Sequence, residues 1–292
     1  MKYAFIRQHR HDYPIGRVYR LAGVSRSGYY AWRKRKPSAR SVDDARLVRL
    51  MRVMQAESRH TYGSPRMTAS LRAGGEWVNH KRVERLMRLH DIRPRTVKRR
   101  KVTTDSKHSK PIYPNLLGQV FQAQAPNQKW LSDITYISTG EGWLYLASVL
   151  DLYSRKIVGW NLRADLRKEL VIGALKRALW QRNTQQSTLV LHSDRGVQYA
   201  SYPYRQLLTN NQVIGSMSGV GNCYDNAPME SFFGTLKREL IHTHYFATRQ
   251  QARNAIVDYI QNFYNLRRRH SALGFLSPNQ FEARYHQHTS VA

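Results

Sequence analysis

Several things are scarce in this sequence, and each scarcity excludes a class of protein. Cys223 is the only cysteine among 292 residues, so an internal disulfide and a thiolate zinc cluster are both excluded. No apolar run approaches the roughly 18 residues of a membrane span, and the first residues lack the apolar core of a signal peptide. We therefore expect no membrane partner and a cytoplasmic location.

Acidic residues are also scarce. There are 19 aspartates and glutamates against 48 lysines and arginines, which gives a formal net charge of +29. Such an excess favours a polyanionic partner, because lysines and arginines that neutralise phosphates release the counterions bound to them. Well over half of the basic side chains lie in residues 1–110. We predict double-stranded DNA as the partner and the N-terminal part as its main contact.

Short basic helices are predicted at the N-terminus. A helix over residues 15–21, a turn at Gly23 and a second helix capped by Ser25 form a pattern typical of a helix-turn-helix, although ordinary helical hairpins share it. The second helix ends in a basic run whose side chains we expect to contact DNA: Arg33, Lys34 and Arg35.

A second helical group follows over residues 42–90. Ser64 and Pro65 are expected to begin one helix, and Asn79 to cap the next, on which Arg82 and Arg85 are expected to contact DNA. Prolines then punctuate a polar, basic stretch. The predicted domains are a helical DNA-binding region (1–92), a linker (93–125) and a catalytic core with its C-terminal helix and tail (126–292).

The hydrophobic pattern changes at Trp130. Three strand-like runs, two shorter strands and interleaved amphipathic helices follow in the order βββ-α-β-α-β-α. This order predicts an α/β class with a mixed sheet flanked by helices. Thr248 and Gln251 form an expected capping box for the last long helix, and Asp165 is expected to cap an earlier one.

Three acidic residues occupy unusual positions in this region. Asp133 lies inside the first strand, Asp194 directly follows a buried strand, and Glu230 lies in the first turns of a helix. A charge within a strand is costly unless something compensates it. Three carboxylates at one sheet edge would bind Mg²⁺, or Mn²⁺, and a pair of such ions can activate an attacking oxygen and stabilise a leaving one. We therefore predict catalytic and metal-binding roles for these residues, with two ions per site.

Four stretches make the pattern specific. They are residues 126–136 (PNQKWLSDITY), 151–160 (DLYSRKIVGW), 192–199 (HSDRGVQY) and 221–233 (GNCYDNAPMESFF). Together with the 35 residues between Asp194 and Glu230, they resemble the second-frame (OrfB) protein of insertion-sequence transposases of the IS-three type, in the superfamily of retroviral integrases. The sequence departs from the family at Gln119, where many members have arginine, and at Gly219 and Val220, where many have a basic pair.

The resemblance implies an RNase H-like integrase core preceded by an all-α, helix-turn-helix-like region. It implies a bacterial polynucleotidyl transferase that cleaves DNA at the inverted-repeat ends of an insertion sequence and joins the freed 3′-hydroxyl to another phosphodiester. We expect a homo-oligomer on DNA, associated with the nucleoid when bound, and an upstream-frame protein as partner or fusion.

Other residues receive roles with open alternatives. Lys237 is two helical turns after Glu230 and is expected to contact a DNA phosphate, unless it is a solvated lysine. His192 either supports the site or is simply a satisfied, partly buried histidine. Arg267 and Arg268 either contact phosphates or stabilise a helix C-terminus. Asp151 is expected to cap a turn rather than bind metal.

Two other functions remain possible at this point. A DNA-binding regulator could retain the catalytic fold without using it, but the complete carboxylate set argues against that. A structure-specific RNase H-like nuclease would not need the basic region over residues 1–110.

Overall fold

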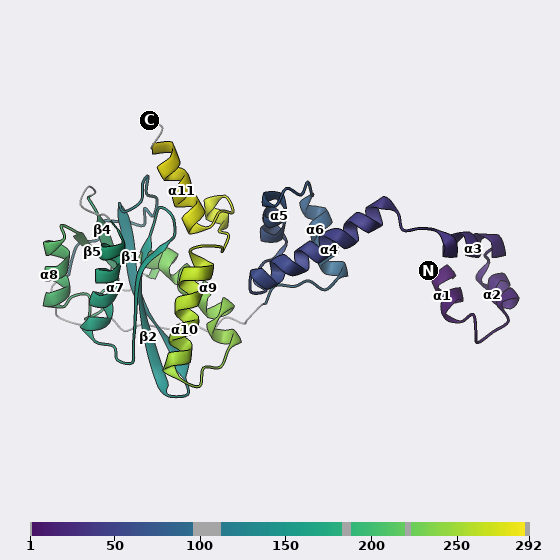
Figure 1. Cartoon of the computed structure of the whole chain (residues 1–292). Helices are drawn as coiled ribbons and strands as arrows, with labels where there is room; N and C mark the ends of the chain where they lie inside the picture. Colours follow the sequence, from purple (N-terminus) through teal and green to yellow (C-terminus); the bar gives the residue numbers. More distant parts are fainter. Residues whose placement is uncertain (1, 96–111, 183–187, 220–222, 290–292) are drawn as a thin grey trace. The chain divides into compact units, whose positions relative to one another are not determined.

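The computed structural model describes residues 2–95, 112–182, 188–219 and 223–289. The chain divides into two compact units, one ending at Met51 and one beginning at Arg52. Figure 1 labels most of their helices and strands. Within the described residues, no helix is long and apolar enough to cross a membrane.

The first unit contains three short helices and the first part of a longer one. Their bounds are α1 (Lys2–Gln8), α2 (Ile15–Ala22), α3 (Arg26–Lys34) and α4 (Ala39–Glu57). Gly23 follows α2 in the left-handed conformation, with a φ of 61°, which glycine adopts at little cost. The Ser25 hydroxyl accepts a hydrogen bond from the Gly28 amide (3.0 Å). The predicted helix, turn and capped helix are therefore present.

The second unit begins with the end of α4 and two further helices, α5 (Ser64–Ala73) and α6 (His80–Leu89). Asn79 caps α6 as predicted, through a hydrogen bond from the Lys81 amide (2.9 Å). Ser64 does not cap α5, because the N-cap position falls on Gly63. The Ser64 hydroxyl instead lies 3.0 Å from Nε2 of His80 and links the two helices.

A mixed five-stranded sheet forms the centre of the second unit. Its strands are β1 (Lys129–Thr139), β2 (Gly142–Asp151), β3 (Ile157–Arg163), β4 (Val190–Ser193) and β5 (Ile214–Met217). The order across the sheet is β3-β2-β1-β4-β5. β2 is antiparallel to both of its neighbours, β1 and β3, whereas β4 is parallel to β1 and to β5. The predicted mixed sheet is thus confirmed.

Helices cover both faces of this sheet (Figure 1). One face packs against α7 (Lys168–Gln181) and α8 (Tyr202–Asn210). The other packs against α9 (Ala227–Glu239) and α10 (Arg249–Asp258), which continues as a π-helical turn over Tyr259–Tyr264. Short 3₁₀ segments lie at Cys223–Asn226, Ile241–Thr243 and Ser271–Leu273.

Two helix caps test the sequence prediction. The capping box of Thr248 and Gln251 is present at the start of α10. The prediction that Asp165 caps α7 is wrong, because Arg167 occupies the N-cap of this helix. The Asp165 carboxylate pairs instead with the Arg163 guanidinium (2.9 Å).

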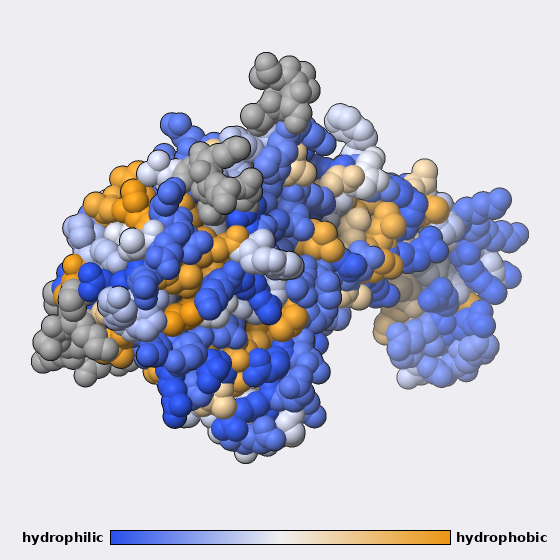
Figure 2. Space-filling view, turned by 60° about the vertical axis from the view of Figure 1, so that its left-hand side comes forward, coloured by the Kyte–Doolittle hydropathy of each residue, from blue (hydrophilic) through white to orange (hydrophobic). Residues whose placement is uncertain are grey.

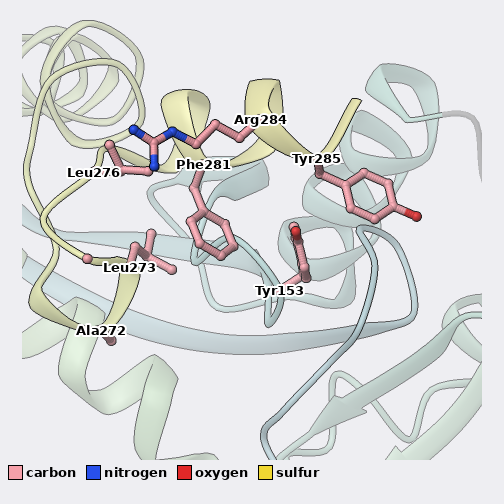
Figure 3. Close-up of a pocket in the computed structure, with 8 residues that line it drawn as sticks. Tyr153, Ala272, Leu273, Leu276, Phe281, Arg284 and Tyr285 are labelled. Atoms are coloured by element: carbon pink, nitrogen blue, oxygen red, sulfur yellow. The ribbon is translucent and has the colours of Figure 1, made fainter. Parts of the chain in front are cut away.

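The last helix, α11 (Pro278–Thr289), is held to the turn between β2 and β3. Tyr153 in that turn contacts the rings of Phe281 and Tyr285, with centroids 5.0 and 5.3 Å apart (Figure 3). The buried Glu282 carboxylate accepts a hydrogen bond from Ser154 (2.7 Å) and pairs with Lys156 (3.0 Å). Aromatic and ionic contacts thus combine to anchor α11.

Part of the predicted linker packs against the core. Leu117 is buried in the cluster on the α9 face, and the Leu116 amide donates to the Ser216 hydroxyl at the end of β5 (2.9 Å). Residues 96–111 of the linker prediction lie outside the described residues. Hydrophilic residues cover much of the face that Figure 2 shows, as expected for so basic a chain.

Candidate functional site

The register of two parallel strands brings the two predicted catalytic aspartates to neighbouring positions. Leu131 of β1 pairs with His192 of β4, and Ser132 pairs with Ser193. One step further along both strands are Asp133 and Asp194. Asp133 shares a strand face with Leu131, which packs in the cluster that includes α9. Both aspartates are partly buried.

Glu230 and Lys237 approach from α9. Glu230 lies in the first turn of this helix and is exposed to solvent. Lys237 lies two turns later and is partly buried, with its ammonium 5.3 Å from the centre of the Tyr136 ring. Because α9 packs on the face of β1 that carries Asp133, the charges of both residues act on that carboxylate.

The electrostatics of Asp133 show how close these groups are. Burial raises the pKa of Asp133 well above its ordinary value, and the negative charges of Asp194 and Glu230 add to the effect. The Ile134 amide, which donates to Oδ1 of Asp133 at 2.7 Å, and the Lys237 ammonium lower this pKa in part. Burial in turn lowers the pKa of Lys237, an effect that Asp133 opposes. Burial and the two acidic neighbours therefore outweigh the Ile134 amide and Lys237 in their effect on Asp133.

Hydroxyl groups and a neutral imidazole lie beneath the aspartates. Buried His192 contacts the hydroxyls of Ser216 through Nδ1 (2.8 Å) and of Ser218 through Nε2 (3.1 Å). Burial lowers the pKa of His192 to about 4, so the ring is neutral at neutral pH. His192 thus links β4 to the end of β5, next to Asp194. The sequence had not indicated Tyr199, whose hydroxyl lies 3.1 Å from that of Ser132.

The carboxylates of Asp133, Asp194 and Glu230 do not converge closely enough to coordinate one ion together. Within the described ranges, the structure contains no group of three or more His, Cys, Asp or Glu side chains placed to hold an ion. The two aspartates are fixed by strands, and their carboxylates also accept backbone hydrogen bonds, as Asp194 does from the Gly196 amide (3.0 Å). Glu230, on the helix surface, is the member that would have to approach them.

Comparison with known proteins identifies the family. The family described as an integrase core domain matches residues 123–223, a second integrase core family matches residues 230–285, and an HTH-like domain matches residues 42–101. Transposase InsF for insertion sequence IS3A, from Escherichia coli K12, is 42% identical over 284 residues, which cover 97% of this chain and 98% of that protein. This chain belongs to the IS3 family of insertion-sequence transposases.

The chain is also similar to other known proteins. An uncharacterized 31 kDa protein of insertion element IS600 from Shigella sonnei is 44% identical over 91% of this chain and 97% of its own length. A solved structure of the HTLV-2 integrase catalytic core domain in complex with magnesium covers 55% of this chain and 99% of that chain, with 16% identity and a TM-score of 0.43. The family assignment makes this chain a DNA transposase, a polynucleotidyl transferase with an RNase H-like core, and its HTH-like domain a DNA-binding region.

One buried aspartate of this transposase, Asp225, was not predicted from the sequence. It connects the segment before β1 to the loop after β5. Asp225 accepts hydrogen bonds from the side chains of Asn115 (3.0 Å) and Gln119 (3.1 Å) and from the Gly219 amide (2.8 Å). Gln119 is one of the positions at which we expected the sequence to depart from the family pattern. The signal that could have revealed Asp225 is its place inside the specific stretch 221–233.

The predicted DNA contacts have different surroundings. Arg33, Lys34, Arg35 and Arg267 are exposed, while Arg82 and Arg85 are partly buried. Arg268 is buried, with only 4% of its surface exposed. Its guanidinium binds both carboxylate oxygens of Glu239 at 2.8 to 3.1 Å. That pairing favours a structural role for Arg268 over the expected phosphate contact.

Proposed function

We propose that Asp133, Asp194 and Glu230 form the catalytic centre that cleaves the ends of an insertion sequence and joins them to target DNA. The observation that carries this proposal is the strand register, which sets Asp133 beside Asp194 on the face that packs against the helix bearing Glu230. Hydrolysis of a phosphodiester at the element end would leave a 3′-hydroxyl. That hydroxyl would then attack a second phosphodiester, so that one ester bond forms as another breaks.

The surroundings of Asp133 fit divalent cations. Its raised pKa reflects a carboxylate that burial and two neighbouring acids leave short of positive charge. Carboxylate oxygens are the ligands that Mg²⁺ and Mn²⁺ prefer. Two such ions, when bound, activate the attacking oxygen and stabilise the leaving one. The protein's part is to fix Asp133 and Asp194 on strands and to bring Glu230 to them from α9.

The remaining chain would hold the DNA. We propose a DNA-binding region over residues 1–92, a linker over 93–125 and a catalytic part over 126–292. In this arrangement Lys237 touches a phosphate near the reacting bond, the exposed basic residues at 33–35 contact the DNA backbone, and His192 supports Asp194. We also propose that the protein acts as a homo-oligomer, with an upstream-frame protein as partner or fusion.

The test uses the full-length protein, Mg²⁺ and DNA that carries the junctions flanking its gene. We expect Asp133→Asn, Asp194→Asn and Glu230→Gln each to lower cleavage by more than about a hundred-fold, because even residues that only orient metal ligands cost 10- to 100-fold when mutated. DNA binding should remain near wild type. Mapping the 3′ ends on sequencing gels measures cleavage, and gel mobility shift measures binding.

Asp165→Asn is the matched control. It removes an acid that pairs with Arg163 on the surface and should leave cleavage unchanged. Wild-type cleavage by any one of the three active-site variants would remove that residue from the catalytic centre.

A further inference from the structure

A second charged site lies on the other side of α9. It is a pocket of about 540 Å³. Its lining comes from the segment around Arg66, the β2–β3 turn, α9 and the segment that follows the π-helical turn. The α9 residues in it include Ser231, which follows Glu230 directly, and Arg238 two turns later. The pocket therefore begins next to the proposed catalytic glutamate and extends about 10 Å along the helix.

The lining of this pocket is strongly basic. Its arginines are Arg66, Arg95, Arg155, Arg238 and Arg268. Among the described residues that line it, Glu239 is the only acid. The Glu239 carboxylate is already bound by Arg268 and by the Tyr259 hydroxyl (2.7 Å). The other arginines in the lining form no ion pair with Glu239.

Two of these arginines, Arg66 and Arg155, are held without a charged partner. Both are partly buried, and neither guanidinium has a hydrogen-bond or ion-pair partner among the residues that the structure describes. Arg66 lies only over the ring of Tyr62, 5.9 Å from its centre. Burial lowers the pKa of both side chains, and for Arg66 the nearby charge of Arg268 adds to the effect, whereas Glu239 opposes it at Arg66 and Asp151 opposes it at Arg155. Holding like charges this way costs stability unless an anion binds.

The backbone of Arg155 strengthens the argument. Its φ is 59°, in the left-handed region that glycine or asparagine occupies more readily than arginine. An arginine kept at such a position is a reason to look for a function of its side chain.

His270 reports the positive potential of the pocket. Its ring lies edge-on to Tyr264, with centroids 4.9 Å apart. Burial lowers the pKa of His270 to about 2, and Arg268, Arg66 and Arg155 contribute in that order. The imidazole therefore stays neutral and does not add to the repulsion.

We propose that this pocket binds a backbone phosphate of the DNA whose neighbouring segment occupies the catalytic centre, through the guanidinium groups of Arg66 and Arg155. The fork of an arginine matches two phosphate oxygens, and the helix shared with Glu230 sets the bound phosphate at a fixed distance from the reaction. Arg66 belongs to the segment that matches the HTH-like domain and Arg155 to the integrase core, so one phosphate would connect the two. This inference rests on the proposed function.

The experiment measures protection of individual arginines. The full-length protein is treated with phenylglyoxal, which modifies accessible guanidinium groups, and each arginine is quantified by mass spectrometry. It is done without ligand, with a double-stranded DNA of about 30 base pairs containing a junction of the element, and with inorganic phosphate. We expect the DNA to slow modification of Arg66 and Arg155 several-fold, with little change at Arg284, which lines a separate, largely apolar pocket (Figure 3).

Binding by variants provides the second measurement. Arg155→Gly suits the backbone at that position, so it should fold, and we expect it to bind this DNA roughly tenfold more weakly at low salt. The slope of log affinity against log salt should fall by about one, as for one lost phosphate contact. The DNA affinity of Arg155→Lys should lie between those of wild type and Arg155→Gly. Lys176→Ala, which removes an exposed charge from α7, is the control and should match wild type.

Each outcome is decisive. DNA that binds but leaves Arg66 and Arg155 as reactive as in the free protein would overturn this inference and leave the proposed function standing. So would a wild-type salt slope for Arg155→Gly. Equal protection by millimolar inorganic phosphate would make the pocket a small-anion site instead. A wild-type protein that does not bind the DNA would overturn both proposals.

Discussion

The two sides of α9 carry opposite charge problems. Toward β1, Asp133 and Asp194 lie side by side with Glu230 nearby, and Lys237 only partly offsets their charge. On the other side, Arg66 and Arg155 lie near Arg268 and form no ion pair with another residue that the structure describes. In the same pocket, Glu239 and Arg268 form an ion pair with each other. Ion pairs such as this one stabilise the fold, whereas clusters of like charge mark the places where an ion or a phosphate is expected to bind.

Breaking the ion pair between Arg268 and Glu239 should have the largest effect on stability. Arg268→Ala leaves the Glu239 carboxylate, about one-tenth exposed, without its partner. We expect a loss of about 3–5 kcal/mol in the free energy of unfolding, measured by urea denaturation with circular dichroism. Arg267→Ala, which removes the exposed neighbouring arginine, is the control and should change stability by less than about 0.5 kcal/mol.

The same pair offers an internal check. Adding Glu239→Gln to Arg268→Ala removes the uncompensated charge and should recover part of the loss. An Arg268→Ala protein as stable as wild type would mean that the pair does not hold α9 to the segment after the π-helical turn.

Removing the negative charge of Asp133 should increase stability rather than decrease it. A folded pKa raised above the unfolded one makes the ionised carboxylate destabilising. This contribution grows as pH rises from the unfolded pKa to the folded pKa and is constant above it. Asp133→Asn should therefore raise the melting temperature at neutral pH without divalent ions by a few degrees, and the difference should shrink on acidification. Mn²⁺ should stabilise wild type and not the variant. Thermal unfolding with and without Mn²⁺ measures both effects.

Asp165→Asn is again the control, because the fold lowers the pKa of Asp165 whereas it raises that of Asp133. The hydrogen bond from Arg163 lowers the pKa of Asp165, so its charge is favourable in the folded state and its removal should not stabilise. If Asp133→Asn melted below wild type in the absence of metal, the carboxylates would be compensated and the comparison between the two sides of α9 would fail.

The smallest expected effect concerns Lys237, whose charge acts on the Asp133 carboxylate. Lys237→Ala should slow strand transfer several-fold at subsaturating DNA, and Lys237→Arg should retain most of the activity, because a phosphate contact depends mainly on charge. Metal-dependent stabilisation should persist in both. Strand transfer that equals wild type in both variants would make Lys237 only a neighbour of Asp133 and Tyr136.

Much of this fold follows from local patterns. Short runs of apolar residues predicted all five strands, because burying one or both faces of a sheet needs a recognisable pattern. Ser25, Asn79 and Thr248 were predicted as caps, since a cap depends on neighbouring backbone amides. The prediction that Asp165 caps α7 was wrong. Its carboxylate accepts a hydrogen bond from Arg163 instead, and a capping rule does not consider such a competing donor.

The sequence alone determined the family, the class of fold and the three carboxylates proposed as catalytic, because specific stretches and their spacing carry that information. Only the tertiary structure distinguished Arg267 from Arg268. The π-helical turn over Tyr259–Tyr264 uses hydrogen bonds such as that from the Asn265 amide to the Ile260 carbonyl (3.0 Å), and its wider turn changes which later side chains face inward. Likewise, residues 66, 155 and 268 have no local relation. Packing brings their charges together, so a pocket of this kind cannot be read from neighbouring positions.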